Sequence, residues 1–392
     1  MHKRFTDLLA QPIAGKVVLV RVDFNVPIKD GVVTDSTRIK ASLETIQSLL
    51  EKQAKVVLVS HLSRPGGKVD DAKRLDPVQL VLQDLLNKPV VKLNEAIGPS
   101  VAKAIKNLNA AEVMLLENIR FYPEEEANDS EFAKTLASYC DYFVQDAFGA
   151  VHRQHASTYG VAQFLPSYPG CLLDKELKYL SGMLNSPQRP FTAIIGGAKI
   201  SSKFSVLKHL LKTVDVMILG GAMVYTLLKA QGVPVGRSLV EDDLIPDAIT
   251  FLSEVKKLNK TLYLPKDHLV VTDFNDPSTA RVTDLISSDD IGVDIGNQAI
   301  DDICELIHSS RCVLWNGPVG IFETSEYSNG TFAIAKALAQ AKETTTVVGG
   351  GDSIAALNLS GYSKSIDHIS TGGGASLEFL EGKLLPGISV LK

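Results

Sequence analysis

The chain has 392 residues, of which 45% are hydrophobic and 22% are charged, a globular composition with room for two or three domains. Its formal net charge is −5, from 40 Lys and Arg against 45 Asp and Glu, which argues against nucleic acid as the main partner. The start lacks the apolar run of a signal peptide, and no window approaches the ~20 apolar residues of a membrane span. We therefore expect a cytoplasmic protein without a membrane partner. The four cysteines have no metal-ligand spacing and are expected to be buried thiols: Cys140, Cys171, Cys304 and Cys312.

Short apolar runs alternate with segments of helical periodicity along the first half of the chain. The runs are nearly continuously apolar, which is typical of strands covered on both faces in a parallel sheet. In chain order, the predicted elements are a strand at 17–22, a helix at 36–52, a strand at 56–60, a helix at 77–86, a strand at 113–116, a helix at 130–136 and a strand at 142–145. Two segments rich in Pro, Gly and Ser, 164–170 and 186–190, then flank a predicted helix at 172–184.

The second half repeats the same alternation. Its predicted elements are a strand at 192–195, a helix at 202–211, strands at 216–219, 268–271 and 313–315, a helix at 330–341 and a strand at 346–348. Repeated strand–helix units predict an α/β fold with right-handed crossovers. We therefore expect two doubly wound parallel-sheet lobes joined by a connecting helix, with the first lobe at 1–170, the connector at 171–189 and the second lobe at 190–375.

Polar and cationic side chains follow the predicted strands of the first half, where open parallel sheets bind their ligands. They are Asp23, Asn25, Arg38, His61, Arg64, Glu117, Asn118, Arg120, Asp146, His152, Arg153 and His155. Guanidinium forks match phosphate and carboxylate oxygens, so converging arginines predict a pocket for a small, multiply charged anion. For any single arginine, pairing with a nearby carboxylate is the competing explanation, and for Arg21, inside a strand, a structural role is favoured. His152 and His155 fit a core or capping role as well as they fit a role in the pocket, and neither has the spacing of a metal site.

Glycines take the place of the arginines at the strand ends of the second half. The glycine-bearing turns are Gly196-Gly197, Gly220-Gly221, Asn316-Gly317-Pro318, Gly349-Gly350-Gly351 and Thr371-Gly372-Gly373-Gly374. Glycine lets a ligand approach backbone N–H groups at the start of a helix. One such turn is also explained by close packing, but five favour a cleft for a nucleotide or polyphosphate. The sequence contains neither a Walker-type loop nor a dinucleotide-binding G-x-G-x-x-G after a strand.

Two lysines and one aspartate add charge to these glycine turns. Lys199 and Lys203 are four residues apart near a predicted helix start, so we expect them to share one helix face and to contact phosphate. Asp352 follows the triple glycine and is a candidate ligand for Mg²⁺ on the phosphates, a role compatible with N-capping of the next helix.

Together these motifs resemble one family, the phosphoglycerate kinases, over the whole chain. The matching runs, in the family's order, are RVDFNVP, SHLSRP, LLENIRF, QDAFGAVHRQHAS, IIGGAKISSK, LGGAM, LWNGPVGIFE, GGGDS and STGGGASLEFLEGKLLPG. The resemblance implies reversible phosphoryl transfer between ATP and 3-phosphoglycerate. It also implies a glycerate-binding first lobe, a Mg-nucleotide-binding second lobe, closure of the two, a monomer, and a C-terminal segment, about 376–392, that packs back on the first lobe.

The resemblance also implies a role for individual residues. For 3-phosphoglycerate it implies Asp23, Phe24, Asn25, Arg38, His61, Leu62, Ser63, Arg64, Arg120 and Arg153. For the nucleotide it implies Gly197, Ala198, Lys203, Gly221, Gly292, Asn316, Gly317, Val319, Glu323, Gly350, Gly351, Asp352 and Ser353, with Asp352 also holding Mg²⁺. For catalysis it implies Arg38, Lys199 and Gly373. The sequence departs from the family at Ser63, where Gly is usual and the turn is expected to be stiffer, and at Ser353, which replaces a common Thr.

The absence of an activated nucleophile fits this activity. A carboxylate with a pKa of about 4 is already ionised at neutral pH, so no general base is required. Two alternative functions are a binding protein that closes on an anion without chemistry and a kinase for another small molecule.

Overall fold

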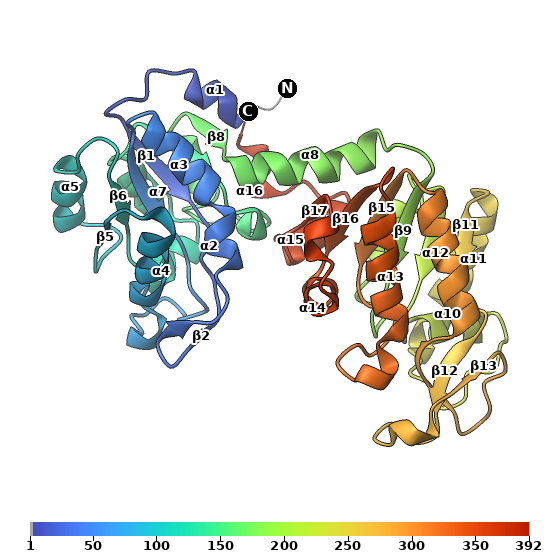
Figure 1. The fold of residues 1–392 in the computed structure, drawn as a ribbon. Coiled ribbons are helices and arrows are strands. Elements are labelled where there is room, and N and C mark those ends of the chain that lie inside the picture. Colours follow the sequence, from blue (N-terminus) through green and yellow to red (C-terminus); the bar gives the residue numbers. More distant parts are fainter. Residues whose placement is uncertain (1–2, 392) are drawn as a thin grey trace. The chain divides into compact units, whose positions relative to one another are not determined.

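Two compact units make up the structure, a computed structural model that describes residues 3–391 (Figure 1). The first unit holds the described residues up to Lys178 and those from Leu384 onward, and the second unit holds Tyr179–Lys383. The division falls within α8 (Cys171–Asn185), where the sequence predicts the connecting helix.

The C-terminal segment joins the first unit later than the sequence suggests. The expected return starts near Ser376, whereas the division into units places it at Leu384. The reason is that α15 (Gly374–Leu380) packs against α9 (Phe204–Leu210) of the second unit. The last helix, α16 (Pro386–Ser389), belongs to the first unit, where the backbone N–H of Gly387 donates to the carbonyl of Val151 at 2.8 Å.

A six-stranded parallel sheet in the order β5-β6-β4-β1-β7-β8 forms the centre of the first unit. Its strands are β1 (Val17–Arg21), β4 (Lys55–Val59), β5 (Val90–Lys92), β6 (Val113–Leu115), β7 (Tyr142–Gln145) and β8 (Ser167–Pro169). A hairpin of β2 (Ile28–Lys29) and β3 (Val32–Val33) stands apart from this sheet. The helices before α8 are α1 (Phe5–Leu9), α2 (Thr37–Ala41), α3 (Leu43–Glu51), α4 (Asp76–Leu86), α5 (Pro99–Lys106), α6 (Pro123–Glu126) and α7 (Ser130–Ala137).

Successive residues of the central strands enter two different cores. Val18 and Val20 of β1 belong to a cluster with apolar residues of α3 and α4, while Leu19 between them packs with residues of α5 and α7. Both faces of the sheet are thereby covered, which explains why its central strands are apolar at consecutive positions. The predicted helix at 36–52 is two helices, because the chain turns at buried Ser42 between α2 and α3.

The second unit has its own six-stranded parallel sheet, in the order β11-β10-β9-β15-β16-β17. Its strands are β9 (Phe191–Ile195), β10 (Val216–Leu219), β11 (Thr261–Tyr263), β15 (Cys312–Asn316), β16 (Thr345–Gly349) and β17 (His368–Ile369). Its other helices are α10 (Val224–Ala230), α11 (Ile245–Lys257), α12 (Asn297–Ser309), α13 (Asn329–Gln340) and α14 (Gly351–Ser360). Trp315 of β15 is fully buried in the core formed with α12, α13 and α14.

One predicted strand lies in a different sheet from the others. The run 268–271 forms β12 (His268–Val271), which pairs antiparallel with β13 (Arg281–Thr283) and β14 (Ile291–Ile295). The expectation that it belongs to the parallel sheet is therefore wrong. A short apolar run is compatible with either sheet, and its partners are set by the tertiary fold. Within residues 3–391, no helix is long and apolar enough to span a membrane.

Candidate functional site

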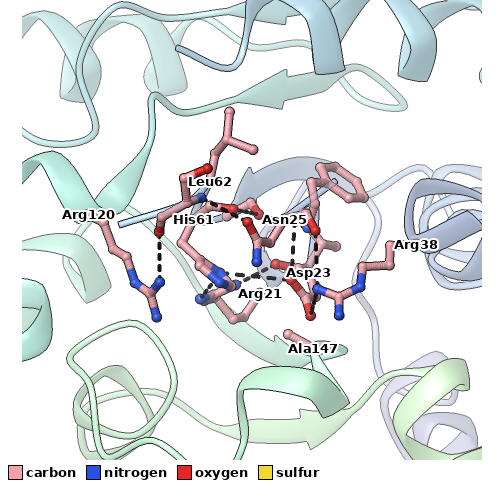
Figure 2. A network of polar contacts seen from close by, with 12 residues as sticks. Arg21, Asp23, Asn25, Arg38, His61, Leu62, Arg120 and Ala147 are labelled. Atoms are coloured by element: carbon pink, nitrogen blue, oxygen red, sulfur yellow. Dashed lines mark hydrogen bonds and ion pairs between the residues drawn. The ribbon is translucent and has the colours of Figure 1, made fainter. Parts of the chain in front are cut away.

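The first candidate site lies where β1 and β4 end in the first unit (Figure 2). Asp23 follows β1 and is buried, and its Oδ2 accepts a hydrogen bond from Arg38 Nη1 at 3.0 Å. Arg38 comes from α2 and also donates to the backbone carbonyl of Asn25 at 3.2 Å. The Asn25 Oδ1 accepts the backbone N–H of Ser63, in the loop after β4, at 2.8 Å. These bonds join the loops after two neighbouring strands and hold Arg38 between them.

Ser63 connects this arrangement to a second arginine. Its carbonyl accepts a hydrogen bond at 2.8 Å from Nη1 of Arg120, which lies on the 3-10 helix Ile119–Phe121 that follows β6. Ser63 has a φ of +56°, a left-handed conformation that glycine adopts without steric cost. That conformation explains why glycine suits this position. The next residue, Arg64, is exposed and lies close enough to Arg120 for its charge to lower the pKa of that guanidinium, after the larger effect of burial.

Buried Arg21 fixes the protonation state of His61. The Arg21 Nε donates to Ser157 Oγ at 2.8 Å, and its Nη2 lies 3.2 Å from His61 Nδ1. A guanidinium only donates, so Nδ1 of His61 accepts and the ring is neutral with its proton on Nε2. Burial, together with the positive charges of Arg21, Arg120 and Arg38, holds the pKa of His61 well below its ordinary value. His61 therefore offers a hydrogen bond and no charge.

The loop after β7 contacts a buried acid of α6, Glu125. Glu125 is fully buried and accepts hydrogen bonds from the backbone N–H and the hydroxyl of Ser157, at 2.8 and 2.6 Å. Burial raises the pKa of Glu125. His155 Nδ1 lies 3.9 Å from its carboxylate, and burial and neighbouring arginines lower the pKa of His155 to about 4. Arg153 is exposed and His152 is half-buried on the same loop.

The first site thus brings several arginines together around few acids. Arg38 and Arg120 are part-buried, and Arg64 and Arg153 are exposed at its edge. Phe24 and Leu62 are buried beside them, and the backbone N–H of Phe24 donates to Ser60 Oγ at 2.9 Å. Such an excess of fixed positive charge suits a small anion with phosphate or carboxylate oxygens.

The second candidate site is a cavity of about 530 Å³ inside the second unit. It is lined mainly by apolar side chains and backbone, and the predicted nucleotide residues in its wall are Gly197, Ala198, Gly221, Gly292, Val319, Glu323 and Asp352. The turns around it are packed too tightly for side chains. A Cβ on Gly221 would lie 2.5 Å from the carbonyl oxygen of Gly197, and one on Gly196 would lie 2.1 Å from that of Pro318. The cavity is large enough for a nucleoside.

Cationic and amide groups lie next to this cavity. The ammonium of part-buried Lys203 donates to Oδ1 of Asn316, the last residue of β15, and the Asn316 Nδ2 is buried with no hydrogen-bond partner within residues 3–391. Burial lowers the pKa of Lys203, and the charge of Asp352 partly offsets this. An unpartnered buried donor beside a lysine is suited to an incoming phosphate oxygen.

The triple-glycine turn orders the start of α14. Gly350 has a φ of +93° and precedes that helix. The Ser353 hydroxyl of its first turn accepts the backbone N–H of Gly317. Gly351 has open space where a Cβ would point, and Gly373 similarly precedes α15 with a φ of +52°. Gly373 does not line the cavity, and neither do Gly317, Gly350, Gly351 and Ser353.

The expectation that Lys199 and Lys203 share a helix face is wrong. The helix α9 begins at Phe204, and both lysines precede it, Lys203 within a turn. The cause is Glu241, which accepts the backbone N–H of Ser201 at 3.0 Å and its hydroxyl at 2.6 Å and so stabilises the turn. Lys199 is exposed, whereas Lys203 is directed to Asn316.

Asp352 fits a magnesium ion held on a nucleotide. Among residues 3–391, no cluster of three or more His, Cys, Asp or Glu forms a metal site. Asp352 is exposed in the cavity wall, and within the same range its carboxylate makes no hydrogen bond or ion pair. One carboxylate combined with substrate phosphates and water is a common donor set for Mg²⁺.

Sequence reasoning missed several polar residues of the cavity wall: Tyr225, Arg237, His268 and Asp294. Burial raises the pKa of Asp294 to about 7, and lowers that of His268 to about 4. A charged residue inside the apolar run IGVDI was a signal that could have identified Asp294.

Three of the four cysteines are part-buried and Cys312 is buried, and all four are free thiols with pKa values raised by burial.

Comparison with known proteins gives one consistent result. The sequence model of the phosphoglycerate kinase family matches residues 8–383. A phosphoglycerate kinase of Dictyoglomus turgidum (strain DSM 6724 / Z-1310) is 51% identical over 392 residues, which is 100% of this chain and 99% of that protein. The solved phosphoglycerate kinase of Coxiella burnetii has a TM-score of 0.90 at 38% identity, covering 97% of both chains. That of Pyrococcus horikoshii OT3 has a TM-score of 0.85 at 32% identity, covering 99% of this chain and 98% of that one.

Proposed function

Because the chain belongs to the phosphoglycerate kinase family, we propose that its first unit binds 3-phosphoglycerate and its second unit binds the nucleotide. The enzyme transfers a phosphoryl group reversibly between ATP and the carboxylate of 3-phosphoglycerate, giving ADP and 1,3-bisphosphoglycerate, the reaction of glycolysis and gluconeogenesis (EC 2.7.2.3). The observation that carries the division of labour is a chemical contrast. Arginines gather at the strand ends of one unit, and a glycine-walled cavity with a lysine and an aspartate lies in the other.

In the first unit, the charges orient the acceptor. Arg38 is held by Asp23 and by the Asn25 carbonyl, so its guanidinium has a defined direction at little further cost in entropy. Neutral His61 has its Nε2–H free of the Arg21 contact and donates to a substrate oxygen. Arg64, Arg120 and Arg153 supply the remaining positive charge for the phosphate.

In the second unit, the base and ribose occupy the cavity, with Glu323 on the ribose, and the phosphates extend toward Lys203 and Asn316. Asp352 would hold Mg²⁺, which supplies positive charge to the phosphate oxygens when it is bound. Lys199 is exposed, its ammonium makes no hydrogen bond within residues 3–391, and it stabilises charge on the transferring phosphoryl group. We further propose that the units approach each other during turnover, because in-line transfer requires the two substrates to be in contact.

The acceptor needs no general base, since its carboxylate is ionised at neutral pH. The neutral state of His61 agrees with this role, because a positioned donor and not a proton acceptor is required there. We also propose that the enzyme is a monomer and works in the cytoplasm, the compartment of the glycolytic reactions.

The proposal is tested with a coupled assay of ATP and 3-phosphoglycerate, run beside glycerate without its phosphate. Turnover with glycerate alone would point to a different small-molecule kinase, and binding without turnover would point to a binding protein. Arg64→Ala should weaken 3-phosphoglycerate binding and leave nucleotide affinity intact. Lys199→Ala should lower kcat by roughly 10²-fold with little change in glycerate affinity. An equal loss of affinity for both ligands in Arg64→Ala would contradict the assignment of one substrate to each unit.

A further inference from the structure

One buried amide connects the two loops that carry Arg64 and Arg120. Asn118 follows β6 and is 0% exposed. Its Oδ1 accepts the backbone N–H of Leu62 at 3.1 Å and that of Arg120 at 3.2 Å. Its Nδ2 donates to the carbonyl of Leu62 at 2.8 Å and to the carbonyl of Lys73 at 3.0 Å. Three separate segments of backbone therefore meet on this single side chain.

These four bonds use the full capacity of the amide. A side-chain amide has two N–H donors and an oxygen that accepts two hydrogen bonds, and each of the four has a backbone partner here. No other side chain of this size provides the same set, because Asp lacks the donors and Leu lacks both. Leu62 lies in the loop after β4, outside any strand. The amide therefore supplies the backbone hydrogen bonds that a neighbouring strand would otherwise supply.

Asn118 influences the anion site through Ser63. Ser63 follows Leu62 directly, and its N–H donates to Asn25 while its carbonyl accepts from Arg120. Fixing Leu62 therefore fixes the contacts of Ser63 on both sides. Figure 2 shows Leu62, Asn25 and Arg120 around this loop.

Glu117 in turn holds the amide in place. It is 1% exposed, and its Oε1 accepts the backbone N–H of Asn118 at 2.8 Å and that of Leu75 at 3.0 Å. Its Oε2 accepts from Lys92 Nζ at 2.6 Å and from Arg74 Nη1 at 3.0 Å. A buried carboxylate with four partners resists displacement, so the start of the loop after β6 is rigid.

We propose that Asn118 is a positioning residue of the anion site, which sets the separation of the Arg64 and Arg120 loops without touching the substrate. The proposal rests on the assignment of 3-phosphoglycerate to the first unit. Its function is to hold the cationic loops at one spacing before the substrate arrives, so that binding does not have to order them.

The test compares Asn118→Ala and Asn118→Asp with a matched control, Gln79→Ala. Gln79 is also an amide that joins two segments of the first unit, donating to the Val90 carbonyl at 3.0 Å and to Gln83 Oε1 at 3.2 Å, but it lies on α4 away from the anion site. The dissociation constant of 3-phosphoglycerate and the KM of both substrates are measured on the full chain at a temperature where each variant is folded, alongside its melting temperature.

We expect Asn118→Ala to weaken 3-phosphoglycerate binding by about tenfold to a hundredfold, with the KM for ATP changed less than twofold. Asn118→Asp, which keeps the acceptors but sets an oxygen against the carbonyls of Leu62 and Lys73, should show a loss in the same direction. Gln79→Ala should lower the melting temperature without changing 3-phosphoglycerate affinity. In an Arg120→Ala background, Asn118→Ala should cost less than in the parent enzyme, because the two residues act through the same loop.

Two results would overturn the proposal. One is a variant of Asn118 that melts earlier but binds 3-phosphoglycerate within twofold of the parent. The other is full additivity with Arg120→Ala. The proposed function is judged separately. If Arg64→Ala leaves 3-phosphoglycerate binding unchanged, the assignment of the site fails. If Arg64→Ala weakens 3-phosphoglycerate binding but Asn118→Ala does not, the positioning role alone is overturned.

Discussion

Replacing Gly292 by alanine should block the nucleotide cavity by displacing one tyrosine ring. Gly292 lies in β14 and in the cavity wall, and a Cβ there would be 1.7 Å from the Tyr225 hydroxyl oxygen and 2.1 Å from its Cζ. Ordinary contact starts at 3.4 Å, so the ring must move by about 1.7 Å, a distance set by the steric requirement of the new methyl group.

The Tyr225 ring borders the cavity. Tyr225 is 3% exposed, and its ring packs on His268 with the centroids 5.5 Å apart, while both residues line the cavity. Movement into the cavity reduces the space for the base. Overpacking of this kind costs about 1–3 kcal/mol of stability. The displaced ring opposes binding of the base at a comparable cost in free energy. We therefore expect the KM for ATP to rise by about tenfold or more, since each 1.4 kcal/mol is a factor of ten.

The assay is steady-state kinetics with each substrate varied in turn, together with a melting curve. Gly292→Ala should raise the KM for ATP and leave the KM for 3-phosphoglycerate unchanged. Adding Tyr225→Leu, which removes the colliding atoms, should recover most of the lost ATP affinity. The control is Gly182→Ala in α8, where no described atom lies within 4 Å of the added Cβ and the helix should gain about 0.5–1 kcal/mol. Unchanged ATP kinetics and melting in Gly292→Ala would refute the reasoning.

Three further predictions concern single groups. Burial raises the pKa of Asp146 to about 8. Its contribution to stability is therefore present at low pH and is lost as the pH rises from about 4 to about 8. The free energy of unfolding falls over that range by at most about 1.4 kcal/mol per pH unit. The melting temperature of Asp146→Asn relative to the parent should therefore increase over that range, and a constant difference would contradict it. Ser63→Gly should raise the free energy of unfolding by about 0.5 kcal/mol, because the left-handed strain is relieved, and should leave 3-phosphoglycerate kinetics unchanged, because the Ser63 contacts to Asn25 and Arg120 use its backbone. Lys203→Met should raise the KM for ATP by about tenfold or more and lower the melting temperature modestly, because the buried Asn316 Oδ1 loses its donor, and an unchanged KM for ATP would contradict the role of Lys203.

The sequence predicted the α/β class and the positions of the polar and glycine-bearing turns because these depend on local pattern. Nearly continuous apolar runs such as Val17 to Val22 specify a strand covered on both faces, and the residues after each run must then lie at one edge of the sheet. The resemblance in motifs added the chemistry of the family, and the family comparison supports the same activity.

The partners of each group were decided by the tertiary structure, because they come from segments far apart in the sequence. Glu241 accepts the backbone N–H of Ser201, 40 positions away, and stabilises a turn before α9, so Lys199 and Lys203 do not share the helix face that their spacing predicted. The strand at 268–271 pairs antiparallel because β13 and β14 lie beside it, which no local pattern records. Asn118 is one amide among many in the sequence, and its role appears when the backbone of Leu62, 56 positions earlier, folds against it.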